Sequence, residues 1–231
     1  IQSRSVPDIL WLLKPLDRRF PMTDIELCFA PATEIAALMA RGEVSAVEVL
    51  AAQLDQIEKV NPMVNAMVTV DADGAMDRAR QADSARAKGE SLGVLHGLTV
   101  GVKDLVLTKG MRTTFGSPIY RDNVPDCDHL IVEREKQAGA VLLGKTNTPE
   151  FGAGAQTFNP VFGVTCNPYD LSKTCGGSSG GSAVALACGM LSLADGSAFG
   201  GSLRAPAAWC NVVGLRPSPG RVPVYPTRFP W

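Results

Sequence analysis

The spacing of apolar residues predicts helices in several parts of the chain. Between 47 and 57 the apolar residues recur every three or four positions, so they lie on one face of a helix. Ser45 and Glu48 form a capping-box pattern at its start, and the pair Asn61 and Pro62 predicts its end. Similar patterns predict four further helices, over 33–41, 71–88, 128–138 and 180–188. Thr33 is the expected cap of the first and Gly42 its stop, whereas Gly139 and Gly189 follow the last two.

Two apolar runs predict buried strands. The segment Leu98–Leu107 (LTVGVKDLVL) predicts a strand that ends in a loop, and Ala140–Gly144 predicts a second one. Because these strands alternate with helices, the pattern indicates an α/β fold. No internal repeat or linker divides the chain. The abrupt change in character at Met22 predicts a leader or added extension over 1–21 and one domain over 22–231.

Composition and charge narrow the function classes. Of the 231 residues, 45% are hydrophobic and 19% charged, as in ordinary globular proteins, and the net charge of −1 does not favour nucleic acid or a membrane surface as partner. No segment has the roughly 20 consecutive apolar residues of a membrane-spanning helix. The six scattered cysteines, without a C-x-x-C pair, predict reduced thiols and a cytoplasmic protein. The two histidines, His96 and His129, disfavour a histidine metal site and leave few choices for a Ser-His-Asp triad.

The segment Gly139–Thr146 (GAVLLGKT) matches the pattern of a phosphate-binding loop. Such a loop must expose its backbone N–H groups and run into a helix N-terminus. Here the four middle residues are apolar, and Pro149 disfavours helical conformation at Thr148. We therefore predict a core strand that ends in a polar turn rather than a nucleotide site.

Two runs of glycine and serine, Cys175–Ala183 (CGGSSGGSA) and Gly196–Ser202 (GSAFGGS), stand on either side of an apolar segment. A flexible linker would be flanked by polar sequence, whereas the first run is followed by AVALACGML. The pattern favours two loops at one end of the same layer. Glycines there would let a substrate approach backbone N–H groups closely, although two structural turns would have the same composition.

These segments belong to a series of blocks that resembles the amidase signature family of serine hydrolases. The resemblance covers roughly 33–222. The blocks, in order, are LHGLTVGVKDLVLTKGMRTTFGS (Leu95–Ser117), AGAVLLGKTNTPEFG (Ala138–Gly152), NPVFGVTCNPYD, CGGSSGGSA and GGSLRAPAAWCNVVGLRPSPGRV.

The resemblance implies a fold and an activity. The expected fold is an α/β mixed sheet layered with helices on both faces. The expected reaction is hydrolysis of a carboxylic amide to an acid and ammonia or an amine through an acyl-serine intermediate. It implies a small-molecule amide as substrate and no cofactor or metal, and it leaves a homodimer open.

Carried over position by position, the resemblance implies a catalytic unit of nucleophile Ser202, bridging serine Ser178 and base Lys103. It also implies a cis peptide bond between Gly177 and Ser178, whereas Arg204 is expected to form a structural salt bridge. The implied oxyanion hole consists of the backbone N–H groups of Phe199, Gly200, Gly201 and Ser202, with Ser179 donating a supporting hydrogen bond.

The chemistry of Lys103 is consistent with this role. A serine hydroxyl is a weak nucleophile that needs a base within hydrogen-bond reach. Lys103 follows an apolar strand, and burial there would lower the pKa of its ammonium and favour the neutral amine. The neighbouring carboxylate of Asp104 would oppose this effect, but alternation along a strand directs it to the other face.

Two departures from the family pattern leave alternatives open. Ala198 stands where the family often has an aspartate, so a carboxylate that the family pattern implies for holding the nucleophile loop is absent. The chain also ends shortly after the signature region, whereas family members are usually about twice as long. A non-catalytic fragment of an amidase and an A-type subunit of an amidotransferase therefore stand beside the amidase.

Overall fold

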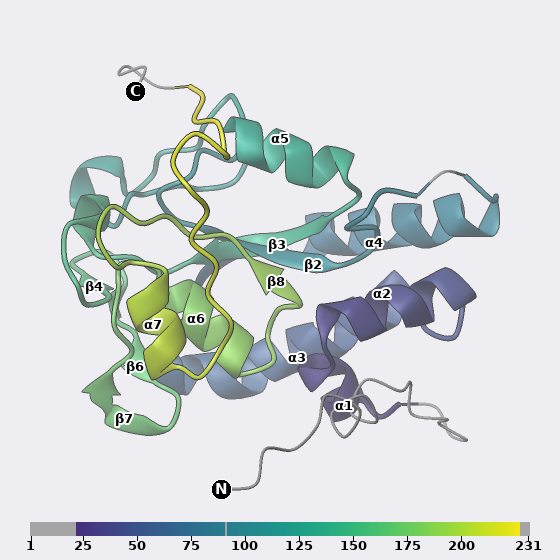
Figure 1. Cartoon of the computed structure of the whole chain (residues 1–231), viewed down its shortest axis with the longest axis horizontal. Helices are drawn as coiled ribbons and strands as arrows, with labels where there is room; N and C mark the ends of the chain where they lie inside the picture. Colours follow the sequence, from purple (N-terminus) through teal and green to yellow (C-terminus); the bar gives the residue numbers. More distant parts are fainter. Residues whose placement is uncertain (1–21, 91, 227–231) are drawn as a thin grey trace, which may run out of the picture.

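The computed structural model describes residues 22–90 and 92–226, so the predicted leader over 1–21 lies outside the described residues. A four-stranded sheet has the order β1 (Met67–Val70), β3 (Val141–Thr146), β2 (Thr99–Lys103) and β8 (Leu193–Ala194). Strand β2 runs parallel to β3 and β8, whereas β1 runs antiparallel to β3. Helices cover both faces of this mixed sheet (Figure 1). The predicted α/β fold class is therefore confirmed.

The helices of the described chain differ in length and place. Helix α5 packs against one face of the sheet, and α3 and α6 pack against the other (Figure 1). The helices are α1 (Asp24–Phe29), α2 (Ala32–Arg41), α3 (Ala46–Val64), α4 (Ala72–Ala87), α5 (Leu130–Gln137), α6 (Gly180–Ala187) and α7 (Arg204–Trp209). Short 3-10 turns lie at Pro118–Tyr120 and Glu150–Gly152, and two small hairpins pair β4 (Phe158–Asn159) with β5 (Gly163–Val164) and β6 (Cys166–Asn167) with β7 (Asp170–Thr174). No helix in the described ranges is long and apolar enough to cross a bilayer.

The predicted long helix is present, but its end was predicted wrongly. The capping box is formed, with the Ser45 hydroxyl accepting from Glu48 N–H and the Glu48 carboxylate accepting from Ser45 N–H. Helix α3 continues through Pro62 and ends at Asn65, which adopts a left-handed conformation with φ 52°. Pro62 leaves α3 with one backbone hydrogen bond fewer but does not end it; the left-handed Asn65, whose N–H donates to the Asn61 carbonyl, does.

Other predicted helix boundaries shift by one or two residues. Helix α2 begins at Ala32, so the predicted cap Thr33 lies inside it, whereas Gly42 ends it with φ 73° as predicted. Helix α5 begins at Leu130, two residues later than predicted, because the His129 side chain accepts from Ile131 N–H and caps it.

The two predicted strands have different lengths from those expected. Strand β2 ends at Lys103, because the next backbone segment turns so that the Asp104 carboxylate accepts from Thr114 N–H. Strand β3 continues through Lys145 and Thr146, so the predicted polar turn at these residues is wrong. Their pairing with Val102 and Lys103 of β2 explains the extension. The prediction of a core strand in GAVLLGKT is confirmed.

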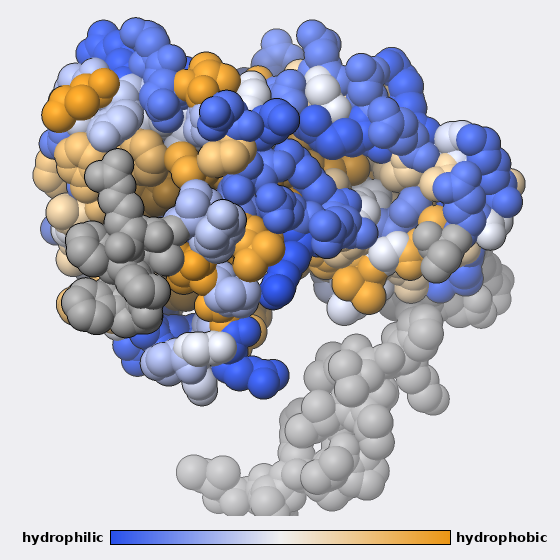
Figure 2. Space-filling view, turned by 90° about the horizontal axis from the view of Figure 1, so that it is seen from above, coloured by the Kyte–Doolittle hydropathy of each residue, from blue (hydrophilic) through white to orange (hydrophobic). Residues whose placement is uncertain are grey.

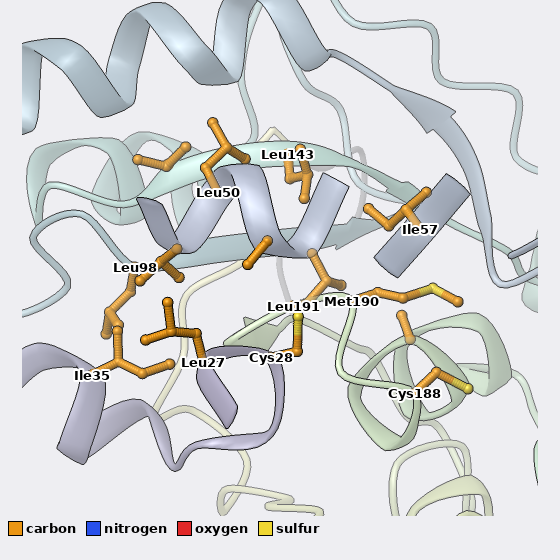
Figure 3. Packing of buried hydrophobic residues seen from close by; sticks show 14 of the residues in the cluster. Leu27, Cys28, Ile35, Leu50, Ile57, Leu98, Leu143, Cys188, Met190 and Leu191 are labelled. Carbon is orange, nitrogen blue, oxygen red and sulfur yellow. The ribbon is translucent and has the colours of Figure 1, made fainter. Parts of the chain in front are cut away.

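Apolar packing holds both faces of the sheet. The larger cluster joins α2, α3 and α6 to one face, with Ile35, Leu50 and Leu143 at most 1% exposed (Figure 3). The smaller cluster joins Val132 of α5 to Val100 of β2 on the other face. Seen from the α5 side, the surface is largely hydrophilic with separate hydrophobic patches (Figure 2). The central strands are therefore fixed from both sides, which positions the residues at their ends.

Candidate active site

Lys103, the last residue of β2, lies in a shell of serine oxygens. Its side chain is fully buried, with a relative exposure of 0%. Its Nζ lies 2.8 Å from Ser178 Oγ, 2.9 Å from Ser179 Oγ and 3.1 Å from Ser197 Oγ. Burial lowers the pKa of this amine to about 7, against a smaller opposing effect of the Asp195 carboxylate. About half of this amine is thus neutral near pH 7, and it lies within reach of three hydroxyl groups.

The first glycine-serine run brings Ser178 and Ser179 to the lysine. Gly176 has φ 77°, and the Gly177–Ser178 peptide bond is cis. Gly180 starts α6 against the Thr157 hydroxyl, where an added Cβ would lie 2.2 Å from Thr157 Oγ1. The run therefore requires glycine for the turn and for the close approach to the neighbouring loop.

Ser179 connects the two loops rather than capping α6. Although it occupies the N-cap position, its side chain makes no capping hydrogen bond. Its hydroxyl contacts Lys103, donates to the Ser197 carbonyl at 3.2 Å and accepts from Ser197 N–H at 3.3 Å. These contacts place the start of the second glycine-serine run directly beside the first.

Ser202 lies next to this group but is not joined to it through its side chain. Its carbonyl accepts from Ser179 N–H at 3.2 Å. The Ser202 side chain is partly exposed, and its hydroxyl makes no hydrogen bond within the described ranges. The structure thus gathers Lys103, Ser178 and Ser179, and leaves the Ser202 hydroxyl free at their border.

The residues of the predicted oxyanion hole form the exposed tip of the second run. Phe199 and Gly200 are exposed, and Gly201 is partly buried. Over the part of the chain that is described, the N–H groups of these three residues donate to no carbonyl or side-chain oxygen. Arg204 forms no salt bridge with any described residue, contrary to expectation, because its guanidinium donates to the Gly200 carbonyl at 2.7 Å.

Ser197 is a contact of the lysine that the sequence did not predict. Both its hydroxyl and its carbonyl, at 3.3 Å, lie within reach of Lys103 Nζ. The only sequence signal for Ser197 was its place in a glycine-serine run, but serines of ordinary turns occur in the same kind of sequence. The separation of 94 positions along the chain hides this contact from any local pattern.

Two carboxylates near Lys103 act differently. Asp104 faces Thr114, so it points away from the amine as predicted. Asp195, which no sequence pattern indicated, accepts from Lys103 N–H through Oδ1 at 2.6 Å. Burial raises the pKa of Asp195 to about 6, although the bond from Lys103 N–H and nearby lysines lower it.

A cavity of about 1100 Å³ borders the serine cluster. Ser179, Ser197 and Phe199 line it on one side, and the segment 212–220 lines another. A space of this size accepts a small organic molecule. A neutral amine that contacts a hydroxyl beside such a space can serve as a general base for an attacking serine.

Comparison with known proteins gives consistent matches. A family model described as Amidase matches residues 48–228. The A-type subunit of the Glutamyl-tRNA(Gln) amidotransferase of Salinispora tropica is 51% identical over 199 residues, which are 86% of this chain and 40% of that relative. The protein of the same name from Moorella thermoacetica is 46% identical over 87% of this chain and 41% of its own length. The chain thus spans about two fifths of the length of the curated relatives it matches.

Solved structures agree in fold. A bacterial aryl acylamidase of the amidase signature enzymes has a TM-score of 0.82 at 35% identity, over 86% of this chain and 42% of that one. Fatty acid amide hydrolase has a TM-score of 0.77 at 29% identity, over 81% of this chain and 33% of that one. The fold predicted from the sequence blocks is therefore the fold observed.

Proposed function

The chain belongs to the amidase signature family, and from this premise we propose that the protein hydrolyses carboxylic amides through an acyl-serine intermediate. The observation that carries the proposal is the 2.8 Å contact between Lys103 Nζ and Ser178 Oγ, made by an amine whose pKa is about 7. A lysine with an ordinary pKa would be protonated and could not accept a proton.

In the proposed mechanism, Ser202 Oγ attacks the amide carbon while its proton passes to Ser178 Oγ. Ser178 in turn releases its own proton to the neutral amine of Lys103. When the tetrahedral intermediate collapses, the proton returns by the same route to the leaving nitrogen, and ammonia or an amine departs. Water then attacks the acyl-serine with the same base, which releases the acid and restores Ser202.

The developing oxyanion would be stabilised by the tip of the second run. The N–H groups of Phe199, Gly200 and Gly201, together with that of Ser202, have no internal acceptor among the described residues. Free backbone donors that converge on one point can stabilise the charge without reorganisation. The Arg204 bond to the Gly200 carbonyl would hold this tip in place, and Ser179 would keep it against Lys103.

A second candidate function is that of an A-type subunit of an amidotransferase. It is favoured by the names of the curated relatives, which reach 51% identity. Such a protein would release ammonia for a partner enzyme rather than act alone. Hydrolysis of simple amides by the purified chain would count against this role, whereas activity that depends on an added partner would support it.

Labelling with a fluorophosphonate tests the proposal. The probe should modify one serine, and mass spectrometry of the peptides should locate the adduct on Ser202. Ser202→Ala should abolish labelling, whereas Ser172→Ala, at an exposed serine of β7, should leave it unchanged. A chain that folds but takes up no probe would instead support the non-catalytic alternative.

A further inference from the structure

We propose that Asp195 is a positioning residue that holds the backbone of Lys103 and places a negative charge near its amine. The geometry stands by itself, but the catalytic meaning of the inference rests on the proposed function. Asp195 is 9% exposed and directly follows β8. It is therefore placed between the sheet and the second glycine-serine run.

Three hydrogen bonds fix Asp195. Its N–H donates to the Gly101 carbonyl at 2.9 Å, and its Oδ1 accepts from Lys103 N–H at 2.6 Å. Its carbonyl accepts from the Ser182 hydroxyl of α6 at 2.8 Å. The residue thus joins the end of β2 to α6, the helix that directly follows Ser179.

The bond to Lys103 replaces a strand contact. Strand β8 pairs with β2 only at Val100 and Gly101, so a backbone carbonyl of β8 does not reach Lys103 N–H. The Asp195 side chain satisfies this buried donor instead, which lets the main chain leave the sheet at once. That departure brings Ser197 back to the Lys103 amine, 3.1 Å from its Oγ.

The charge of Asp195 acts on the same amine. Burial lowers the pKa of Lys103 to about 7, and the Asp195 carboxylate is the group that opposes this effect. The other ionisable groups that face Asp195 are Lys145 of β3 and Glu135 of α5; α6 contributes the neutral Ser182. Asp104, in contrast, acts on Lys145.

This arrangement separates a structural contribution from an electrostatic one. Asp195→Asn keeps an oxygen that can accept from Lys103 N–H but removes the charge. Asp195→Ala removes both. The pKa of Lys103 should therefore fall below its value of about 7 in the asparagine variant, since only the effect of burial remains.

The test is an NMR titration of the lysine side chains in the full chain, with the Lys103 signal assigned by its loss in Lys103→Met. We expect the pKa of Lys103 to fall by about one pH unit or more in Asp195→Asn. It should stay unchanged in Asp104→Asn, which removes the neighbouring buried carboxylate. An unchanged pKa in Asp195→Asn, or equal shifts in both variants, would overturn the inference.

The pH dependence of fluorophosphonate labelling supplies a second measurement. Asp195→Asn should retain the wild-type labelling rate at high pH, and the fall of this rate at acidic pH should begin at a lower pH. Asp195→Ala should label at least about tenfold more slowly at every pH. Equal loss in both variants at high pH would contradict a positioning role. If the wild type takes up no probe, the proposed function fails, and the titration alone decides the role of Asp195.

Discussion

Two buried lysines on neighbouring strands show how the two faces of one sheet differ. Lys103 of β2 and Lys145 of β3 are both 0% exposed, and burial lowers the pKa of each, to about 7 and about 8. Lys103 faces α6 and three serine hydroxyls. Lys145 faces the other side, where it donates to the Val106 carbonyl and the Thr108 hydroxyl.

The electrostatic surroundings differ as much as the contacts. Among the residues that the structure describes, only the carboxylate of Asp195 raises the pKa of Lys103. Four carboxylates, those of Asp104, Asp195, Glu135 and Asp128, raise the pKa of Lys145. Similar burial therefore leaves one amine beside serine hydroxyls, where it is available for proton transfer, and the other under the electrostatic influence of several carboxylates. Burial of a lysine alone does not identify a base; the groups that it faces do.

The largest expected effect separates the two lysines in reactivity. Lys103→Met should reduce the rate of fluorophosphonate labelling by about 10²–10⁴-fold, because the base is lost while an apolar side chain of similar length fills the site. Lys145→Met, the matched control, should label at nearly the wild-type rate while folded. Circular dichroism at the labelling temperature verifies that each variant is folded. Equal losses of labelling rate in the two variants would show that Lys103 has no catalytic role that distinguishes it from Lys145.

The next effect separates them in stability. Lys145→Met should lower the free energy of unfolding by about 1–3 kcal/mol, because it removes the cation that stabilises the buried Asp104 carboxylate and leaves the Val106 carbonyl without its charged donor. Lys103→Met should cost much less, since its partners are neutral hydroxyls. Urea denaturation of both variants at pH 7 measures the difference. A larger loss of unfolding free energy in Lys103→Met would mean that Lys103, not Lys145, is the lysine with the structural role.

The smallest effect concerns pH. Between the folded pKa of Lys103, about 7, and its unfolded value of 10.5, the unfolded chain binds one more proton, so the free energy of unfolding gains a contribution that rises with pH. Lys103→Met should reduce this slope by about 1.4 kcal/mol per pH unit between pH 8 and 9. Denaturant titrations at the two pH values measure it. Identical slopes in wild type and variant would mean that Lys103 remains charged in the folded state.

Local sequence patterns predicted much of the fold. The capping box at Ser45 and the apolar spacing after it identified α3, and the apolar run in GAVLLGKT identified β3 rather than a phosphate loop. These features depend on residues within one or two turns of each other. Pro62 led to a wrong prediction of the end of α3, because a proline does not by itself end a helix. The turn at Asn65 ends α3 instead.

The candidate site was predicted in part. The glycine-serine runs and the apolar strand before Lys103 indicated which segments carry the chemistry. Ser197 and Asp195 were missed, because their contacts to Lys103 join segments more than 90 residues apart. Lys145 was predicted to lie in a polar turn, since a Lys-Thr pair after an apolar run is usually exposed.

By itself, the sequence determined five of the helices, the central strands β2 and β3, the two glycine-rich turns and a short set of serines with one lysine of the right chemistry. Only the tertiary structure decided which lysine faces which partners. The β2–β3 register shifts by one residue after Val100, so that Lys145 pairs with Val102 and Thr146 with Lys103. Side chains alternate between the faces of a sheet, so this register places the two lysines on opposite faces. One amine consequently contacts the serine loops, and the other contacts the Val106 carbonyl and the Thr108 hydroxyl on the opposite face.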